Sequence, residues 1–252
     1  MGWGNSVSES DAGSDILVLH GGAGPGSVAT IATHLSESAH VLVPTHPGWD
    51  GTPRPAEVNS IPDLARSYLR ILAERDLREV VVIGSSIGGW IAAEMAVRDT
   101  GNRLAGLILI DAVGIRVDDA PIRDIFALTP EQVARYSWHD PERAPRSAPE
   151  PTPAQAAARR ANMAALRYYA GDPYMHNPNL AARLPEVSAP TLLLWGESDG
   201  IATPAYGAAY AAAFGDARLE IISEAGHLPH MEQPEATFAH LDAHLSALRK
   251  AS

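Results

Sequence analysis

Three residue types that carry nucleophilic catalysis stand directly after apolar runs of this chain, at Ser86, Asp199 and His227. A serine hydroxyl becomes a strong nucleophile when a histidine accepts its proton, and a carboxylate can hold that histidine in the required tautomer. These residue types therefore predict a Ser-His-Asp triad that works through an acyl-enzyme, provided that the fold brings them together. Serine, aspartate, histidine is one of the chain orders in which such triads occur.

The local sequence around Ser86 strengthens its assignment as the nucleophile. Gly84-Ser85-Ser86-Ile87-Gly88 matches the pattern G-x-S-x-G. The pattern follows the apolar run EVVVI and opens the stretch SIGGWIAAEMAV, which has helical character. This strand–turn–helix setting is typical of a nucleophile elbow, in which a sharp turn exposes the serine hydroxyl at a helix N-terminus. The alternative is that Ser86 is an ordinary helix N-cap.

The acid of the predicted triad has three candidates. Asp199 ends the run TLLLW, and Thr203-Pro204 offers the following helix its own N-terminal cap. Asp199 is then left to orient a histidine. Glu197 and Asp111 are the alternatives, since each also lies at the end of an apolar run.

The base is expected to be His227, on a loop after the last apolar run, with His230 as the alternative. A metal site built from His227, His230 and an Asp has poor ligand spacing, and the chain contains no Cys to offer a thiolate. The predicted chemistry requires neither a metal nor a cofactor.

A glycine-rich segment, His20-Gly21-Gly22-Ala23-Gly24-Pro25-Gly26, follows the first apolar run. Such a loop can aim backbone N–H groups at a site, so we expect it to supply half of an oxyanion hole. Gly22 is the chosen donor, Ala23 is the alternative, and the N–H of Ile87 is the second donor. A phosphate-binding loop is disfavoured, because neither Gly-Lys-Ser/Thr nor the spacing G-x-G-x-x-G is present.

The elements that must position these residues follow a regular alternation. Helical stretches, among them 61–74, 87–98, 206–214 and 236–248, separate short apolar runs of the kind found in parallel strands buried on both faces. This alternation predicts a doubly wound α/β fold with a mostly parallel sheet. Each triad member ends a different strand, at the edge where open α/β sheets place their sites. The runs are 15–22, 40–48, 78–86, 104–112, 189–199 and 217–227.

One segment, 114–188, interrupts the alternation because it contains no convincing strand. Thr129-Pro130 and Thr152-Pro153 each provide a Thr N-cap with Pro at the first helical position. The second helix should run to about Ala170, with Gly171 as its C′ stop. We interpret 114–188 as a helical cap inserted into a core made of 15–113 and 189–252, after a flexible N-terminus, 1–14. A longer helical crossover is the alternative.

At this level the sequence resembles the α/β-hydrolase fold superfamily, in its abhydrolase-1-like branch with a single helical cap. The resemblance is carried by LHGGAGPG, HPGWDGTPRP, VIGSSIGGW, LWGESDGIATP and EAGHLPHMEQPE, which spread over 19–235. It implies the roles given above for Ser86, Asp199, His227, and Gly22 with Ile87. It also implies the strand order 1-2-4-3-5-6-7-8, with a cap after strand 6. Few residues precede the first run, so we expect the N-terminal hairpin to be reduced.

The substrate is expected to be a small to medium uncharged acyl compound, a carboxylic ester, held under the cap. The glycine loop also resembles those of C–C bond hydrolases and proline iminopeptidases. A C–C hydrolase, lactonase, lyase or perhydrolase using the same triad is therefore the alternative, and a non-catalytic receptor is a third. The expected pocket lining is aromatic: Trp49, Trp90, Phe126, Tyr136, Trp138, Tyr168 and Tyr169.

Composition limits the partners and the cellular location that we expect. The chain has 252 residues, 46% hydrophobic, and a net charge of −11. That charge repels phosphate backbones, so we expect no nucleic-acid partner. No apolar run approaches the length that spans a bilayer, and the N-terminal residues lack the features of a signal peptide. We expect a cytoplasmic monomer or homodimer whose partner is a small-molecule substrate.

Overall fold

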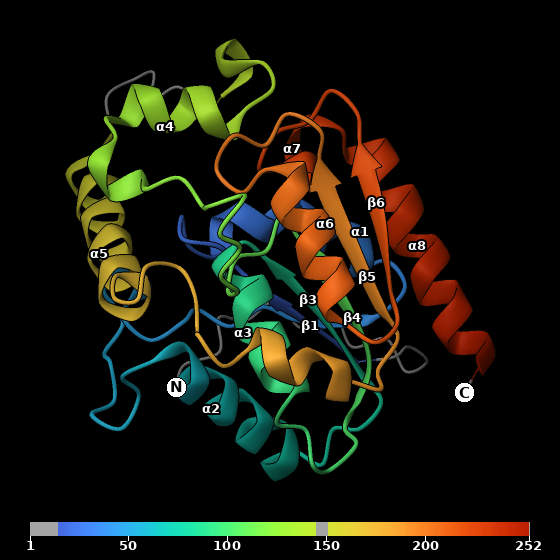
Figure 1. Ribbon diagram of the computed structural model, residues 1–252. Helices are drawn as coiled ribbons and strands as arrows, with labels where there is room; N and C mark the ends of the chain where they lie inside the picture. Colours follow the sequence, from blue (N-terminus) through green and yellow to red (C-terminus); the bar gives the residue numbers. More distant parts are fainter. Residues whose placement is uncertain (1–14, 145–150, 252) are drawn as a thin grey trace.

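A six-stranded parallel sheet forms the centre of the molecule in the computed structural model, which describes residues 15–144 and 151–251 (Figure 1). The strands lie in the order β2-β1-β3-β4-β5-β6, and every neighbouring pair is parallel. The strands are β1 (Asp15–Leu19), β2 (His40–Leu42), β3 (Val80–Ser85), β4 (Leu104–Ile110), β5 (Thr191–Gly196) and β6 (Ala217–Ile222).

This order equals the last six positions of the strand order that the resemblance implied, and the first two have no counterpart among the described residues. The prediction of a flexible segment 1–14 lies outside those residues. The predicted doubly wound α/β fold is confirmed.

Helices cover both faces of the sheet because successive strand residues point to opposite sides. One core cluster joins alternate strand residues, such as Leu17 and Leu193, to α2 (Ile61–Glu74), α3 (Ile87–Ala96) and α6 (Pro204–Ala213). A second cluster joins the intervening residues, such as Val18 and Leu194, to α1 (Ala29–Leu35) and α8 (Pro234–Ala251). The short helix α7 (Pro229–Glu232) precedes α8.

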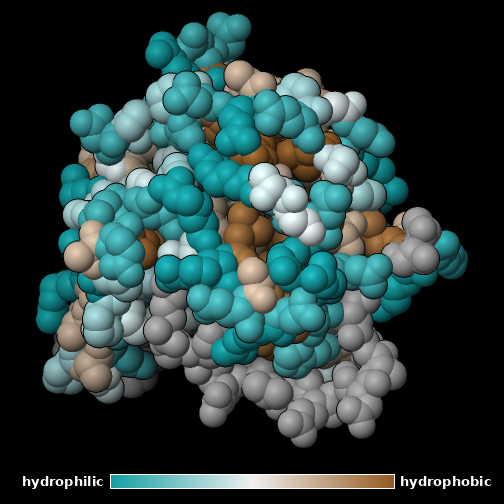
Figure 2. All heavy atoms as spheres, turned by 90° about the horizontal axis from the view of Figure 1, so that it is seen from below, coloured by the Kyte–Doolittle hydropathy of each residue, from teal (hydrophilic) through white to brown (hydrophobic). Residues whose placement is uncertain are grey.

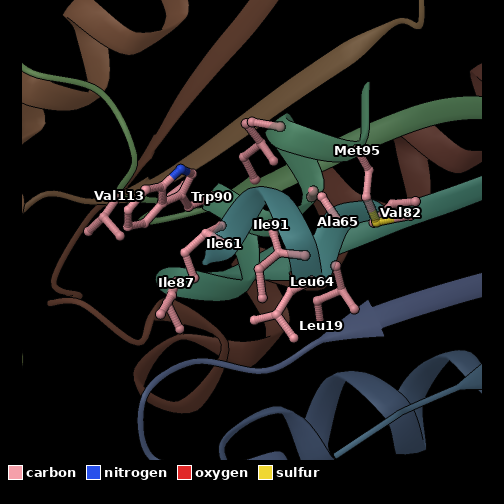
Figure 3. Packing of buried hydrophobic residues seen from close by; sticks show 14 of the residues in the cluster. Leu19, Ile61, Leu64, Ala65, Val82, Ile87, Trp90, Ile91, Met95 and Val113 are labelled. Atoms are coloured by element: carbon pink, nitrogen blue, oxygen red, sulfur yellow. The ribbon is translucent and has the colours of Figure 1, made fainter. Parts of the chain in front are cut away.

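The first cluster fixes the helix that carries the predicted nucleophile. Ile87, Ile91 and Met95 of α3 lie against Leu64 of α2 and Val82 of β3 (Figure 3). Helix α2 covers the residues that its apolar periodicity predicted. Its first turn is closed by the Ser60 hydroxyl, which accepts a hydrogen bond from the N–H of Asp63.

The segment between β4 and β5 is helical, as predicted. Its two longer helices, α4 (Pro130–Ser137) and α5 (Pro153–Ala170), both begin with a capping box, built on Thr129 and Thr152 respectively. In the described part of this segment there are also three 3-10 helices: Ile125–Ala127, Pro141–Arg143 and Ala181–Glu186. Two more, Pro25–Val28 and Trp49–Gly51, lie in the loops after β1 and β2.

Helix α5 ends at Ala170 and Gly171 follows it as the cap residue, as predicted. Gly171 has φ −84° and ψ −33°, which is right-handed, so no left-handed glycine terminates this helix. A Cβ at this position would lie 2.3 Å from the carbonyl oxygen of Arg167. Close approach to the preceding turn therefore explains the glycine.

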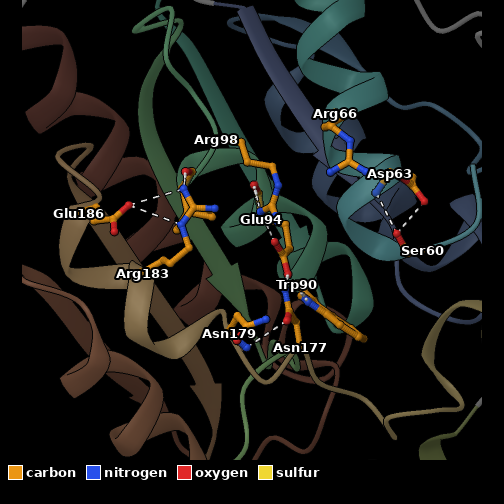
Figure 4. A network of polar contacts seen from close by, with 11 residues as sticks. Ser60, Asp63, Arg66, Trp90, Glu94, Arg98, Asn177, Asn179, Arg183 and Glu186 are labelled. Carbon is orange, nitrogen blue, oxygen red and sulfur yellow. Dashed lines mark hydrogen bonds and ion pairs between the residues drawn. The ribbon is translucent and has the colours of Figure 1, made fainter.

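A buried carboxylate fastens the segment after α5 to the core. Glu94 of α3 is fully buried and accepts hydrogen bonds from Trp90 Nε1 and, at 2.7 Å, from Asn177 Nδ2 (Figure 4). Arg98, four residues further along the chain and just beyond the end of α3, supplies the compensating charge. This network holds the chain that returns from the cap against α3.

Hydrophilic residues cover most of the face seen from below in Figure 2, where hydrophobic residues show only in small, separate places. Within residues 15–144 and 151–251, no helix combines the length and the apolar character needed to cross a membrane.

Candidate active site

Ser86 occupies a strained turn between β3 and α3. Its backbone has φ 55° and ψ −117°, a conformation that residues other than glycine rarely adopt. The Ser86 N–H donates to the carbonyl of Ile110 at 2.9 Å, which ties the turn to the end of the neighbouring strand β4. The predicted strand–turn–helix setting is confirmed, and the strain is of the kind that accumulates at functional sites.

The glycines of the G-x-S-x-G pattern are required by close packing. A Cβ on Gly84 would lie 2.3 Å from the carbonyl oxygen of Gly88, and one on Gly88 would lie 2.1 Å from that of Leu19. Neither glycine has a positive φ. The turn can therefore close only because both positions lack a side chain, and closure brings α3 against the end of β1.

The three residues singled out from the sequence meet at the carboxyl ends of the strands. His227 Nε2 lies 3.0 Å from Ser86 Oγ, and His227 Nδ1 lies 2.7 Å from Asp199 Oδ2. In the tautomer with hydrogen on Nδ1, the imidazole donates to Asp199 and accepts from the serine hydroxyl. Asp199 is 2% exposed and His227 is 9% exposed, so little water competes for these bonds. The arrangement has the geometry of a nucleophile, a base and an orienting acid.

Asp199 has a second set of hydrogen bonds that the sequence interpretation did not anticipate. Its Oδ1 accepts from the N–H groups of Ile201 and Ala202, at 2.8 and 3.1 Å. Thr203, expected to cap the following helix, makes no side-chain cap hydrogen bond. Asp199 therefore closes this turn itself, and the backbone donors fix the carboxylate so that Oδ2 faces His227.

The alternatives for acid and base occupy different places. Glu197 is exposed, and its Oε2 accepts from the N–H of Glu224. His230 is fully buried, and its Nε2 lies 2.8 Å from the carbonyl oxygen of Ser27. Burial lowers the pKa of His230 to about 4, so this ring is neutral at physiological pH. Asp111 alone among the alternatives lies beside the triad.

The glycine loop faces Ser86 across the site. A Cβ on Gly21 would lie 3.4 Å from the Cβ of Ser86, and Gly22 and Ala23 line the same cavity as Ser86 and His227. The N–H groups of Gly22 and Ile87 donate to no acceptor among the described residues. The carbonyl of Gly22 accepts from Trp49 Nε1 at 2.9 Å, which fixes the next peptide, between Gly22 and Ala23. Two N–H donors are thus available to an oxyanion on the serine side of the cavity.

A cavity of about 700 Å³ opens above Ser86 and His227. Its wall is largely aliphatic, and most of that wall comes from the segment between β4 and β5. Polar groups on the wall include Ser27, Asn162 and the guanidinium-bearing Arg159. The aliphatic residues include Val113, Ile122, Ile125, Val133, Leu166 and Ile201.

The predicted aromatic lining is wrong in most positions, since of the seven residues proposed only Trp138 is on the cavity wall. Trp49 and Tyr169 are buried and stacked on each other with ring centres 5.6 Å apart, and the Tyr169 hydroxyl donates to the carbonyl of Val58. Trp90 is buried against Gly114 and donates to Glu94. These rings are structural parts of the core.

The other three rings lie beneath arginine guanidinium groups. The distances from guanidinium carbon to ring centre are 3.5 Å for Arg54 over Tyr168, 3.7 Å for Arg123 over Tyr136 and 4.1 Å for Arg167 over Phe126. Such cation–π pairs suit the solvent side of a helix. These three rings therefore pair with arginines instead of lining the cavity, whose wall is mostly aliphatic.

Two polar residues that the sequence interpretation missed connect the cap to the glycine loop and to the loop that carries His227. Asn162 of α5 is buried, its Nδ2 donates to the carbonyl of Ala23, and its Oδ1 accepts from the N–H of Asp50. Glu232 of α7 is also buried and accepts from the N–H groups of Gly226, His139 and Asp140. No sequence periodicity marks either residue, because each lies where a long-range contact places it.

Asp111, Asp199 and His227 form the cluster of potential metal ligands among the described residues, with ligand atoms within 4.8 Å of one another. Both nitrogens of His227 are already bonded, one to Asp199 and one to Ser86. The cluster is therefore organised for proton transfer rather than for holding an ion.

Comparison with known proteins agrees with this geometry. The sequence model of the Alpha/beta hydrolase family matches residues 16–241. A 2-hydroxy-6-oxononadienedioate/2-hydroxy-6-oxononatrienedioate hydrolase of Cupriavidus pinatubonensis is 23% identical over 91% of this chain and 86% of its own length. A pimeloyl-[acyl-carrier protein] methyl ester esterase of Aromatoleum aromaticum is 27% identical over 88% of this chain and 94% of its own length.

Among solved structures, the 2-hydroxy-6-oxo-6-phenylhexa-2,4-dienoate hydrolase from Rhodococcus sp. strain RHA1 superposes with a TM-score of 0.74. The match covers 95% of this chain and 93% of that one, with 18% sequence identity. At this identity the likeness concerns the fold.

Proposed function

The chain belongs to the alpha/beta hydrolase family, and from that premise we propose that it is a serine hydrolase that cleaves a carboxylic ester through an acyl-enzyme. The observation that carries the proposal is the continuous path of hydrogen bonds from Ser86 through His227 to Asp199 at the base of an apolar cavity.

The first half of the reaction uses Ser86 and His227. The Ser86 hydroxyl adds to the ester carbonyl while its proton moves to His227 Nε2. Asp199 stabilises the resulting imidazolium and holds its orientation. The tetrahedral intermediate collapses, the C–O bond to the leaving group breaks, and His227 returns the proton to the departing alcohol.

The second half releases the acid. A water molecule gives a proton to His227 Nε2 as its oxygen adds to the acyl carbon, and collapse of this second intermediate restores the Ser86 hydroxyl. In both halves the N–H groups of Gly22 and Ile87 would donate to the oxyanion. Removing one such donor typically lowers the rate by about 10²–10³.

The cavity sets the class of acyl group. Its volume of about 700 Å³ is that of an ordinary small-molecule site, and its wall is mostly aliphatic. A small to medium uncharged acyl chain would lie against the side chains contributed by the cap, with its carbonyl at Ser86.

A second candidate, hydrolysis of a C–C bond next to a carbonyl, has one specific observation in its favour. Arg159 is one of the residues that line the cavity, and an arginine can pair with the carboxylate of an acidic substrate in exchange for the contact it already makes. The relative from Cupriavidus pinatubonensis is named for such a dioate substrate.

The experiment is a chain-length series of p-nitrophenyl esters, from acetate to palmitate, alongside a vinylogous diketone acid. We expect kcat/KM to peak at short or medium chains, to be unaffected by micelles, and to vanish in Ser86→Ala. Ser85→Ala is the matched control, because the neighbouring Ser85 hydroxyl is buried without a hydrogen-bond partner among the described residues. A peak at long chains with a jump above the micelle threshold contradicts the proposal. If the enzyme cleaves the diketone acid but none of the esters, hydrolysis of a C–C bond becomes the favoured function.

A further inference from the structure

A second buried carboxyl group stands directly behind the acid of the triad. Asp111 follows β4 as Asp199 follows β5, and it is fully buried. Its backbone has φ 44°, a left-handed conformation that is costly outside glycine and that aims the side chain toward the triad. One ligand atom each of Asp111, Asp199 and His227 lie within 4.8 Å of one another.

The hydrogen bonds around the two carboxyl groups are unequal. Asp199 receives three donors: the N–H groups of Ile201 and Ala202, and Nδ1 of His227. Asp111 receives one, from the N–H of Gly196 at 2.9 Å, and its Oδ2 is buried without a partner among the described residues. Donors stabilise the charged form of a carboxyl group, so the environment favours charge on Asp199.

Two carboxylates this close in a buried site do not both ionise readily, because each disfavours the charge on the other. Burial raises the pKa of Asp111 well above its usual range, and the charge of Asp199, hydrogen bonding to Asp199 and the charge of Glu232 raise it further. The N–H of Gly196 acts in the opposite direction. The titratable groups facing Asp111 are thus Asp199, Glu232 and His227.

We propose that Asp111 is a neutral carboxylic acid that donates a hydrogen bond to the carboxylate of Asp199, and so acts as a positioning residue for the triad. The donated bond would satisfy the otherwise unpaired Asp111 Oδ2. It would also hold Asp199 in one rotamer and keep the total charge of the pair at −1. This inference deepens the proposed function, because it concerns the electrostatic setting of His227 in the proposed reaction.

The test is an NMR titration of the His227 ring in the free full-length protein, with the resonance assigned by loss in His227→Gln. In Asp111→Asn the amide is neutral and keeps a donor, so we expect the titration midpoint to stay within about 0.3 pH units of the wild type. If Asp111 carries a charge in the wild type, the same variant removes that charge. The midpoint would then fall by about one unit or more, and this result would overturn the proposal.

A second variant tests the donor itself. Asp111→Ala removes the hydrogen bond to the Asp199 carboxylate. That carboxylate then interacts more strongly with the imidazolium of His227, so we expect the His227 titration midpoint to rise by about half a pH unit or more. An unchanged midpoint in folded Asp111→Ala contradicts donation. If this variant does not fold, the direction of the shift in Asp111→Asn decides alone.

The titration needs no substrate, so its outcome is separate from that of the esterase assay. A preserved midpoint in Asp111→Asn together with no ester hydrolysis would leave the carboxyl pair standing and reject the proposed function. Ester hydrolysis by the wild type together with a lowered His227 midpoint in Asp111→Asn would support the proposed function and reject the proposed carboxyl pair.

Discussion

The strand ends and the cap meet at one cavity, but they hold their residues in different ways. At the strand ends the backbone does the positioning, since the N–H of Ser86 is bonded to the end of β4 and Asp199 is fixed by two amides of its own turn. The cap is held to the glycine loop by the side chain of Asn162. It is held to the histidine loop by the Glu232 side chain and by a backbone bond from the N–H of His227 to the carbonyl of Ser137 in α4, at 2.7 Å.

This difference assigns the reacting groups to the strand ends and the choice of substrate to the cap. The parallel ladder allows little freedom at the strand ends, so Ser86 and Asp199 are fixed without the cap, whereas the backbone of His227 also bonds to Ser137 of α4. The cap contributes an aliphatic wall from side chains such as Ile122, Val133 and Leu166, and these can vary without disturbing Ser86. Variants in the first region should abolish turnover, whereas those in the second should reduce it or change its selectivity.

The largest effect is expected from Asp199→Asn. The amide favours the wrong imidazole tautomer, and loss of the charge removes stabilisation of the imidazolium, so kcat should fall by about 10⁴. Asp99→Asn is the matched control, because Asp99 also caps a turn by accepting two backbone N–H bonds, from Arg103 and Leu104, but lies outside the site. Near-normal kcat in Asp199→Asn, with loss in Asp111→Asn, would move the acid to the end of β4.

An intermediate effect on stability is expected from His230, which joins α7 to the 3-10 helix Pro25–Val28 without involving the cap. Its folded pKa of about 4 lies below its ordinary value of 6.5, because burial disfavours the charged ring. The neutral ring's contribution is therefore fully present above about pH 6.5 and is lost as the pH falls toward 4, by about 3 kcal/mol.

Urea unfolding at pH 7, 5.5 and 4 measures this loss. The wild type should lose more stability over that range than His230→Gln, which cannot titrate. Equal losses in the two proteins would assign the acid sensitivity to other groups, such as His20, whose pKa burial also lowers to about 4.

The smallest effect is expected from the cap side. Asn162→Ala removes the bonds to Ala23 and Asp50, which loosens the glycine loop, and kcat/KM should fall by about tenfold. The control is Arg160→Ala, on the same helix α5, because Arg160 is exposed and is not on the cavity wall, and it should leave kcat/KM unchanged. If Asn162→Ala turns over esters like the wild type, the cap does not support the oxyanion loop.

The same division explains what the sequence could predict. Apolar runs and the G-x-S-x-G pattern report local structure, and parallel strands bring their carboxyl ends to one edge without further information. The sheet, its helices, and the meeting of Ser86, Asp199 and His227 followed from those signals. The helix N-caps at Thr129 and Thr152 are local too, and both were predicted, although the glutamines that complete the two capping boxes were not.

What the sequence did not predict depends on contacts between distant residues. Aromatic type alone does not tell whether Tyr168 faces the cavity or lies under Arg54, because the outcome depends on the rotation of α5 against the core. Asn162 and Glu232 become important only when the cap is docked. The proximity of Asp111 to Asp199 required the register of β4 against β5 and the left-handed backbone at Asp111.

The central claim, that Ser86 is a nucleophile activated by His227, is tested most directly by a fluorophosphonate probe. The account predicts one added probe mass on the folded protein, located by peptide mapping at Ser86, absent in Ser86→Ala and strongly slowed in His227→Ala. Labelling at Ser85, or no labelling of the folded protein, would contradict it.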